Sequence, residues 1–205
     1  MKTTFQFLQD NRFFFNIIIS VFDRFLIKFI SLIISFILVS KSQNFYATWI
    51  LLMIFSNYFM EFYSMSISKS LPRYLANQGN FKLKILFLNA LYLIFILCLL
   101  TVGAYIFYDK YLYLYLEFED RKILILSSIY GAILSIDALT TRYLNAKLDF
   151  FPVGIFNTIS HVSVLILFLY CLYFLDLDIY LIIESYLCLL LFFSITFCLY
   201  IFIKY

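Results

Sequence analysis

Residues 85–108 read ILFLNALYLIFILCLLTVGAYIFY, a run of 24 positions without a charged side chain. A helix of this length covers about 36 Å, which exceeds the roughly 30 Å of hydrocarbon in a bilayer. Only helices and closed barrels satisfy every backbone hydrogen bond inside a membrane, and an uninterrupted apolar run of about 20 residues or more favours the helix. The stretch therefore predicts a transmembrane helix.

The rest of the chain has the same character. It has 205 residues, of which 65% are hydrophobic and 13% are charged, against about 45–50% and about 25% in an ordinary soluble domain. A soluble domain of this length could not bury so much apolar surface. We therefore expect an all-α, polytopic membrane protein.

Six spans are predicted, and together they form one bundle over residues 1–205. They lie near Phe13–Val39, Phe45–Met65, Ile85–Tyr108, Ile123–Leu139, Val153–Leu175 and Ile179–Ile203. An aromatic belt at the outer membrane interface is also predicted. It would include Tyr46, Trp49 and the stretch YLYLYL at 111–116.

The distribution of Lys and Arg outside these spans predicts the orientation. Nine lie on the side of the two termini, namely Lys2, Arg12, Lys69, Arg73, Lys82, Lys84, Arg142, Lys147 and Lys204. Four lie on the opposite side, namely Lys41, Lys110, Arg121 and Lys122. Because basic residues are retained in the cytoplasm, both termini are expected there.

No catalytic centre, cofactor or metal site is expected, and the chain is not predicted to be an enzyme. The connections between spans are short, so no extramembrane domain is expected to carry soluble chemistry. The four cysteines, Cys98, Cys171, Cys188 and Cys198, fall in apolar segments without a C-x-x-C motif and are interpreted as small hydrophobic residues. No pattern of a nucleophile with a base is recognisable.

The first span contains three charged residues, Asp23, Arg24 and Lys28, in the stretch SVFDRFLIKFI at 20–30. On a helix Arg24 and Lys28 share a face, while Asp23 lies about 100° away from Arg24. A cation at the centre of a bilayer costs at least about 2.5–3.5 kcal/mol. Two cations on one face therefore need a partner or a hydrated cavity.

Three interpretations of these charges remain open. In the first, Asp23, Glu61, Asp137 or Glu184 offsets the two cations in a structural ion network. In the second, Arg24 and Lys28 line a water-filled cavity and attract an anionic substrate such as a phosphate or diphosphate. In the third, the first span is misplaced.

The other polar residues inside the spans give weaker signals. Asn57 and Glu61 are four positions apart on the second span. Solvation at the end of a helix explains Glu61 about as well as a functional role does, and the same holds for Asp137 on the fourth span. His161, the single histidine, could relay protons, although a hydrogen-bonded structural role fits it better. Asp23, Asn57, Glu61, Asp137 and His161 are kept as possible ion, proton or network partners.

Three stretches resemble bacterial polysaccharide flippases of the O-antigen type, within the multidrug, oligosaccharidyl-lipid and polysaccharide exporter superfamily. They are VSKSQNFYATWILL (39–52), SMSISKSLPRYLA (64–76) and RYLNAKLDFFPVGIFNTI (142–159). The family has glycines in the first turn and an Asp-x-Gly after the second span. Here Ala47, Ser64 and Ser66 stand at those positions.

The resemblance implies that the chain corresponds to the amino-terminal half of a transporter with twelve to fourteen spans. A truncated chain, a partner polypeptide and a pair of identical chains all remain open. The implied function is the flipping of an undecaprenyl-diphosphate oligosaccharide across the bacterial inner membrane by alternating access, for surface polysaccharide or O-antigen synthesis. Arg24 matches a basic residue that is frequent in first spans of the superfamily, whereas Lys28 has no such counterpart.

Three alternatives are kept. A cation-coupled multidrug exporter would bind its ion at Asp23, Glu61 or Asp137. A membrane enzyme, such as a polysaccharide polymerase or acyltransferase, would need a large outer loop or a catalytic His and carboxylate in register. An inactive fragment of a split flippase would keep its hydrophobic spans without transport.

Overall fold

The structure, a computed structural model, describes the backbone of residues 2–64, 80–107, 121–146, 150–175 and 177–204. Side chains are described for residues 18, 21–22, 25–64, 85–106, 122–144, 151–175 and 177–204. The side chains of Asp23 and Arg24, and the 111–116 stretch, therefore lie outside the described residues. The same holds for most of the 64–76 motif.

The described elements are six helices, and no strand occurs in this part of the chain. They are α1 (Lys2–Lys41), α2 (Gln43–Ser64), α4 (Asn80–Phe107), α6 (Arg121–Ala146), α7 (Phe150–Tyr173) and α8 (Ile179–Lys204). The predicted all-helical architecture is confirmed.

Four of the described helices are long and apolar enough to cross a membrane. The segments concerned are Ile85–Ile106, Lys122–Leu144, Phe151–Tyr173 and Ile179–Lys204, in α4, α6, α7 and α8. Helix α2 carries Asn57 and Glu61 within its length. These apolar helices identify a membrane protein.

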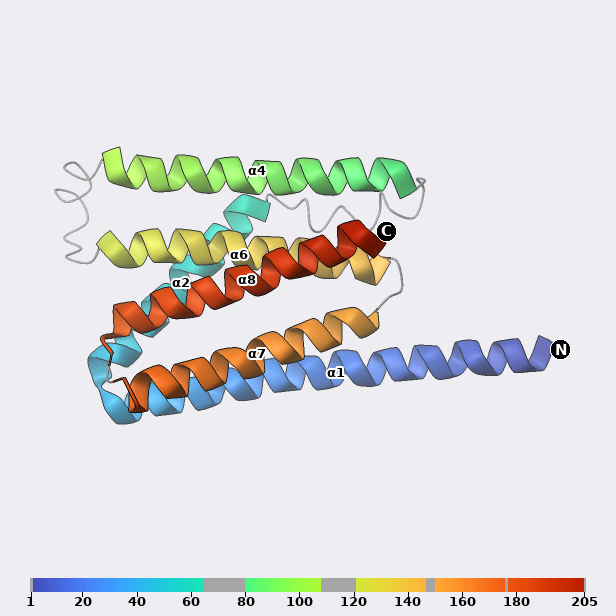
Figure 1. Ribbon diagram of the computed structural model, residues 1–205, viewed down its shortest axis with the longest axis horizontal. Helices are drawn as coiled ribbons and strands as arrows, with labels where there is room; N and C mark the ends of the chain where they lie inside the picture. The colour runs from blue at the N-terminus through green and yellow to red at the C-terminus, as the bar shows by residue number, and fades with distance from the viewer. Residues whose placement is uncertain (1, 65–79, 108–120, 147–149, 176, 205) are drawn as a thin grey trace.

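The helices pack as two neighbouring groups (Figure 1). Helices α1 and α7 lie side by side along one edge of the bundle. Helix α2 crosses α6 diagonally and makes the most extensive helix contact of the bundle with it, and α4 packs against the same helix. Helix α8 contacts both α6 and α7 and so joins the two groups, and both chain termini lie at the same end.

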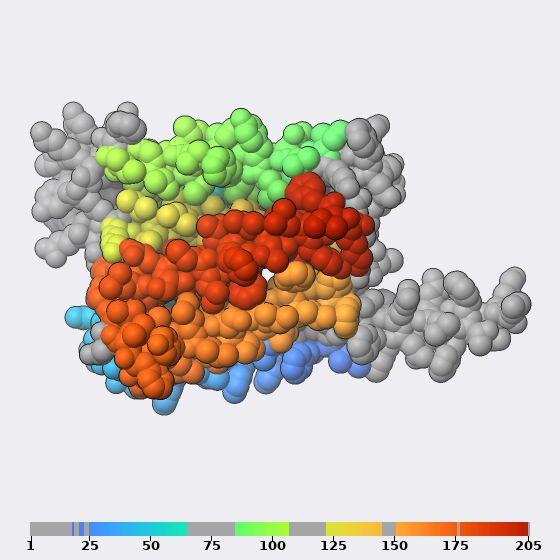
Figure 2. Space-filling view, viewed as in Figure 1, coloured from blue at the N-terminus to red at the C-terminus, as the bar shows by residue number. Residues whose placement is uncertain are grey.

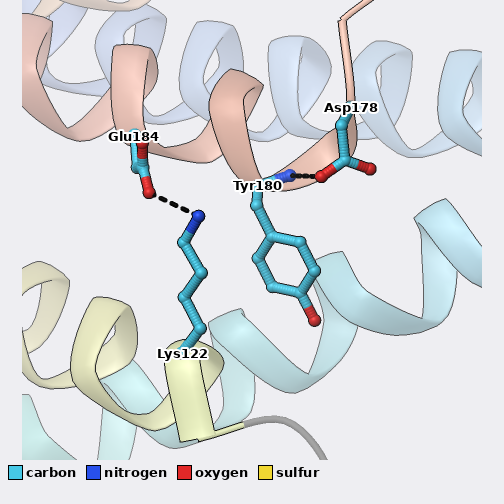
Figure 3. Close-up of polar contacts among 4 residues, drawn as sticks. All are labelled: Lys122, Asp178, Tyr180 and Glu184. Atoms are coloured by element: carbon cyan, nitrogen blue, oxygen red, sulfur yellow. Dashed lines mark hydrogen bonds and ion pairs between the residues drawn. The ribbon is translucent and has the colours of Figure 1, made fainter.

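Two helices begin at a polar side chain that caps them. Ser42, the one residue between α1 and α2, accepts a hydrogen bond from the Asn44 amide at 3.2 Å. Asp178 precedes α8 and accepts a hydrogen bond from the Tyr180 amide at 3.4 Å (Figure 3). Serine and aspartate are favoured at this position because their oxygens satisfy amides that have no partner within the helix.

Helix α6 is longer than the predicted span, which ended at Leu139. It continues to Ala146, since residues 139–146 contain neither Gly nor Pro and the Thr140 hydroxyl donates back to the Ile136 carbonyl at 3.0 Å. Arg142 therefore lies within the helix and not in a cytoplasmic loop. Asp137 lies nine positions before the end of α6, so solvation at a helix end does not explain it.

Small residues bring α2 and α6 together. A Cβ on Gly131 would meet the Phe59 Cβ at 2.5 Å and the Ser56 carbonyl oxygen at 2.9 Å. The Ser135 hydroxyl also lies 3.1 Å from the Met60 carbonyl oxygen of α2. Close backbone approach at small residues is the usual basis of helix packing in membranes, where burial of apolar surface provides little driving force.

The buried apolar residues form two clusters, one in each half of the bundle. The first includes Trp49, which is 2% exposed and packs edge to face on Phe168 and Tyr186 at centroid distances of 5.4 and 5.2 Å. The prediction that Trp49 belongs to an interfacial belt is therefore wrong: it faces α7 and α8 across the bundle. The second cluster gathers residues of α4, α6 and α8 around Phe87 and Tyr143.

Candidate functional site

A cavity of about 430 Å³ lies where the two clusters meet, between α6, α7 and α8. The space-filling view shows a narrow gap between α7 and α8 midway along the bundle (Figure 2). The polar residues that line the cavity are Tyr130, Asp137, Thr141, Arg142, Asn157, Ser160, His161, Tyr186 and Ser194. One α1 residue, Ile27, also lines it. Such a concentration of polar groups among apolar helices makes this cavity the candidate site.

Asp137 supplies the carboxylate of the cavity from the middle of α6. The Ser194 hydroxyl of α8 donates a hydrogen bond to Asp137 Oδ1 at 2.5 Å. Among residues with described side chains, no ion pair is formed by Asp137. A carboxylate within a membrane segment is thus stabilised by a single neutral donor in the described part of the bundle, which is an energetically costly arrangement.

A pair of tyrosines lies two helical turns along α6 from Asp137. The hydroxyls of Tyr130 and Tyr186 are 2.6 Å apart and hydrogen-bonded, and their rings meet edge to face at 5.4 Å. Trp49 packs edge to face on the ring of Tyr186. One hydroxyl donates to the other, and the O–H of the accepting tyrosine is not used in this bond, so this wall of the cavity stays polar.

Helix α7 contributes the imidazole of His161. Its Nδ1 lies 2.7 Å from the Asn157 carbonyl oxygen, one turn earlier on the same helix. Because a carbonyl only accepts, Nδ1 carries the proton, and Nε2 is the acceptor in the neutral ring. His161 therefore has the hydrogen-bonded position that a structural role requires, and its Nε2 can accept a proton as a relay requires.

Arg142 supplies a guanidinium from the same helix as Asp137, five positions further on. It lines the cavity and is partly buried. Carboxylate, guanidinium and imidazole groups thus converge on one space. This set can bind an anionic or a zwitterionic group and can exchange protons.

The structure brings together two of the sequence-predicted residues, Asp137 and His161. Lys28 lies on α1 with an exposed side chain and is not among the residues that line the cavity. Asn57 and Glu61 are exposed on α2. The side chains of Asp23 and Arg24 are outside the described residues.

Glu184, another candidate for an ion network, pairs with Lys122 at the opposite end of the bundle from the termini. Their Nζ and Oε1 atoms are 2.7 Å apart, and the side chains are 49% and 40% exposed (Figure 3). Lys122 also lies 5.2 Å above the Tyr180 ring. This pair joins α6 to α8 in an accessible position and is separate from the cavity.

Sequence reasoning missed Arg142, Ser194 and the two tyrosines as members of the site. Arg142 was assigned to a loop because the end of the fourth span was placed too early. Ser194 is a single polar residue in an apolar run, which is a weak signal. Tyr130 and Asp137 are seven apart and share a helical face, and this spacing could have indicated a polar stripe.

A second hollow, of about 420 Å³, lies on the other side of α7 against α1. Its lining is almost wholly apolar and includes Phe22, Gly154 and Ile155. Helix α7 therefore separates an apolar hollow from the polar cavity.

These features define a polytopic helical membrane protein with a polar cavity between its helices. No family model, curated protein or solved structure matches the chain. Within the described residues, no group of His, Cys, Asp and Glu is arranged to hold a metal ion.

Proposed function

We propose that the chain is one bundle of a membrane transporter and that the polar cavity is its substrate-binding site. The observation that carries the proposal is the convergence of Asp137, Arg142 and His161 on one cavity within three membrane-spanning helices. A charged group near the middle of a membrane helix costs about 2.5–3.5 kcal/mol or more; Asp137 lies well inside its span, whereas Arg142 lies two positions from the end of the same span. Groups retained at that cost typically mark a path for substrates or ions.

The proposed substrate is a lipid-linked oligosaccharide, flipped across the bacterial inner membrane by a chain whose termini are both cytoplasmic. The resemblance to O-antigen flippases supports this choice. Arg142 in the cavity suits the diphosphate, because a guanidinium donates two parallel hydrogen bonds to phosphate oxygens. The apolar hollow across α7 suits the lipid chain of the same molecule.

The volume of the cavity is consistent with a half-transporter. About 430 Å³ accommodates a small charged group but not an oligosaccharide. We therefore propose that the sugars occupy a space shared with a second bundle, either a partner polypeptide or another copy of this chain. Rocking of the two bundles would expose the site to each side of the membrane in turn.

Arg24 and Lys28 enter this proposal through α1. Position 24 precedes Ile27, the α1 residue that lines the cavity, by three positions, which is close to one helical turn. We propose that Arg24 adds to the positive wall at that level. Lys28 follows Ile27 directly and is exposed, where it could meet a second bundle or lipid phosphates.

A cation-coupled exporter is the second candidate, and the position of Asp137 favours it. The carboxylate could bind a cationic substrate directly, as the acidic residues of such exporters would. The presence of Arg142 in the same cavity argues for anionic substrates instead, since a fixed cation repels a cationic one.

Reactivity of introduced cysteines tests whether the cavity is hydrated. In a background without the four native cysteines, Ser160→Cys should react in intact membranes with a water-soluble, membrane-impermeant thiol reagent. Ile166→Cys lies on the same helix but is 62% exposed on the outer apolar face, and it should not react. Equal protection of both cysteines would contradict a hydrated site.

Flipping itself is tested with a fluorescent lipid-linked diphosphate sugar in proteoliposomes. Arg142→Gln should lower the initial rate by about 10- to 100-fold, because a hydrogen bond to a charged group is worth about 1.5–3 kcal/mol. Replacement of Arg24 and Lys28 together by Gln should also abolish transport. Lys41→Gln, an exposed position at the far end of α1, is the matched control. Unchanged flipping by the Arg142 variant at equal protein level would refute the site.

A further inference from the structure

Helices α6 and α8 are joined by polar contacts at three levels of the membrane. Along α6, the Lys122–Glu184 ion pair lies at one end, the Tyr130–Tyr186 hydrogen bond follows, and the Ser194–Asp137 hydrogen bond comes last. The first pair is exposed and the second is neutral. Asp137 is therefore the charged group whose ionisation changes the interior of the bundle.

We propose that Asp137 is a proton-binding site and that binding of the proton promotes binding of an anion at Arg142 in the same cavity. This inference rests on the proposed function and adds its coupling ion. When Asp137 is ionised, its charge offsets that of Arg142. When it is neutral, Arg142 is the remaining fixed charge of the described cavity lining, and the cavity attracts anions.

The surroundings of Asp137 make the neutral form accessible. The described groups that could titrate or carry charge near it are Tyr130 and Arg142 on α6, His161 on α7, and Tyr186 and Cys198 on α8. The described α1 residue at the cavity is Ile27, and α2 and α4 pack against α6 through Gly131 and through aromatic and small side chains. Ser194 is the one described side chain that donates to the carboxylate. The negative charge of ionised Asp137 is therefore stabilised only weakly.

A proton fits this site better than a sodium ion. Sodium sites in transporters use several oxygens, including backbone carbonyls freed where helices unwind. Here α6 and α8 are continuous helices through Asp137 and Ser194, so their carbonyls remain in helical hydrogen bonds. The Ser194 hydroxyl also donates to Asp137. The hydroxyl hydrogen of Ser194 therefore points toward the space that a cation beside the carboxylate would occupy.

His161 can deliver the proton. Its Nδ1 hydrogen is held by the Asn157 carbonyl, so an incoming proton binds Nε2 and forms an imidazolium. Transfer through the cavity breaks this Nε2–H bond and forms an O–H bond on Asp137, which returns the ring to its neutral form. The carboxylate loses its negative charge, and no other bond changes.

Proton binding by the purified chain in nanodiscs tests the inference. Infrared difference spectra between about pH 4 and pH 9 report the protonated-carboxyl band. Asp137→Asn should lose about one protonating carboxyl per chain relative to wild type, and Asp137→Glu should restore it. Asp178→Asn is the control, because Asp178 is exposed at the start of α8. This variant should remove only the signal of a carboxyl group that is in contact with bulk water.

Coupling is tested with inorganic pyrophosphate as the anion probe. Calorimetry in two buffers of different ionisation enthalpy should show proton uptake when pyrophosphate binds to wild type, and uptake should vanish in Asp137→Asn. An identical carboxyl titration in wild type and Asp137→Asn, or a titration that shifts with sodium concentration, would overturn the inference. If the wild-type protein showed the Asp137 titration but did not flip the lipid-linked sugar, the result would count against the proposed function alone.

Discussion

Replacement of Gly131 by Ala should destabilise the bundle by about 1–3 kcal/mol, the usual cost of inserting a methyl group into a packed core. The new Cβ would lie 2.5 Å from the Phe59 Cβ, whereas carbon atoms pack best at about 3.5–4.0 Å. The Ser56 carbonyl oxygen at 2.9 Å and the Met60 amide nitrogen at 3.1 Å are backbone atoms and cannot rotate away. Helix α2 must therefore shift by about 1 Å relative to α6.

The free energy of unfolding can be measured by reversible denaturation in mixtures of mild detergent and SDS. Gly103→Ala on α4 is the matched control, because nothing lies within 4 Å of its Cβ position. Alanine is favoured over glycine in a helix by about 0.5–1 kcal/mol, so this control should be neutral or slightly stabilising. If the two variants had equal stability, the close approach of α2 and α6 would be refuted.

The remaining predictions concern contacts between helices. A double-mutant cycle on Lys122 and Glu184 should give about 0–1 kcal/mol, because the pair is exposed; a larger coupling would show that it is shielded. Fluorescence of Trp49 should resist both aqueous iodide and brominated lipids, since the side chain is 2% exposed, and strong quenching by the lipids would place it at the membrane interface. Tyr130→Phe should cost about 1–3 kcal/mol by leaving the Tyr186 hydroxyl unpaired, and the double Phe variant should recover part of that loss in the same unfolding assay.

The architecture was predictable because a membrane tolerates few alternatives. Apolar runs such as 85–108 must become helices, since no other single segment satisfies its own backbone inside a bilayer. The end of the fourth span was not predictable from hydropathy, because Thr141 and Arg142 resemble a loop by composition although they continue α6. Helix propensity, which is high for arginine and is not reduced by Gly or Pro here, was the better signal.

The site was partly predictable, since Asp137 and His161 were selected as polar residues within spans. Their convergence depends on which faces of α6 and α7 meet α8, and an apolar stripe does not specify this when helices are hydrophobic on all sides. Trp49 shows the same limit. Its position near a span end suggested an interface, but packing on Phe168 and Tyr186 places it inside the bundle.

The single residue between α1 and α2 has a mechanical consequence. Ser42 ties α1, of the α1–α7 group, to α2, of the α2–α4–α6 group, at the end opposite the termini, and the short α7–α8 connection lies at that same end (Figure 1). At the end of the termini, three residues connect the end of α6 at Ala146 to the start of α7 at Phe150, so short links join the two groups at both ends. Any opening into the bundle must therefore arise by tilting or sliding of helices between these links, and not by separation of the two groups at one end.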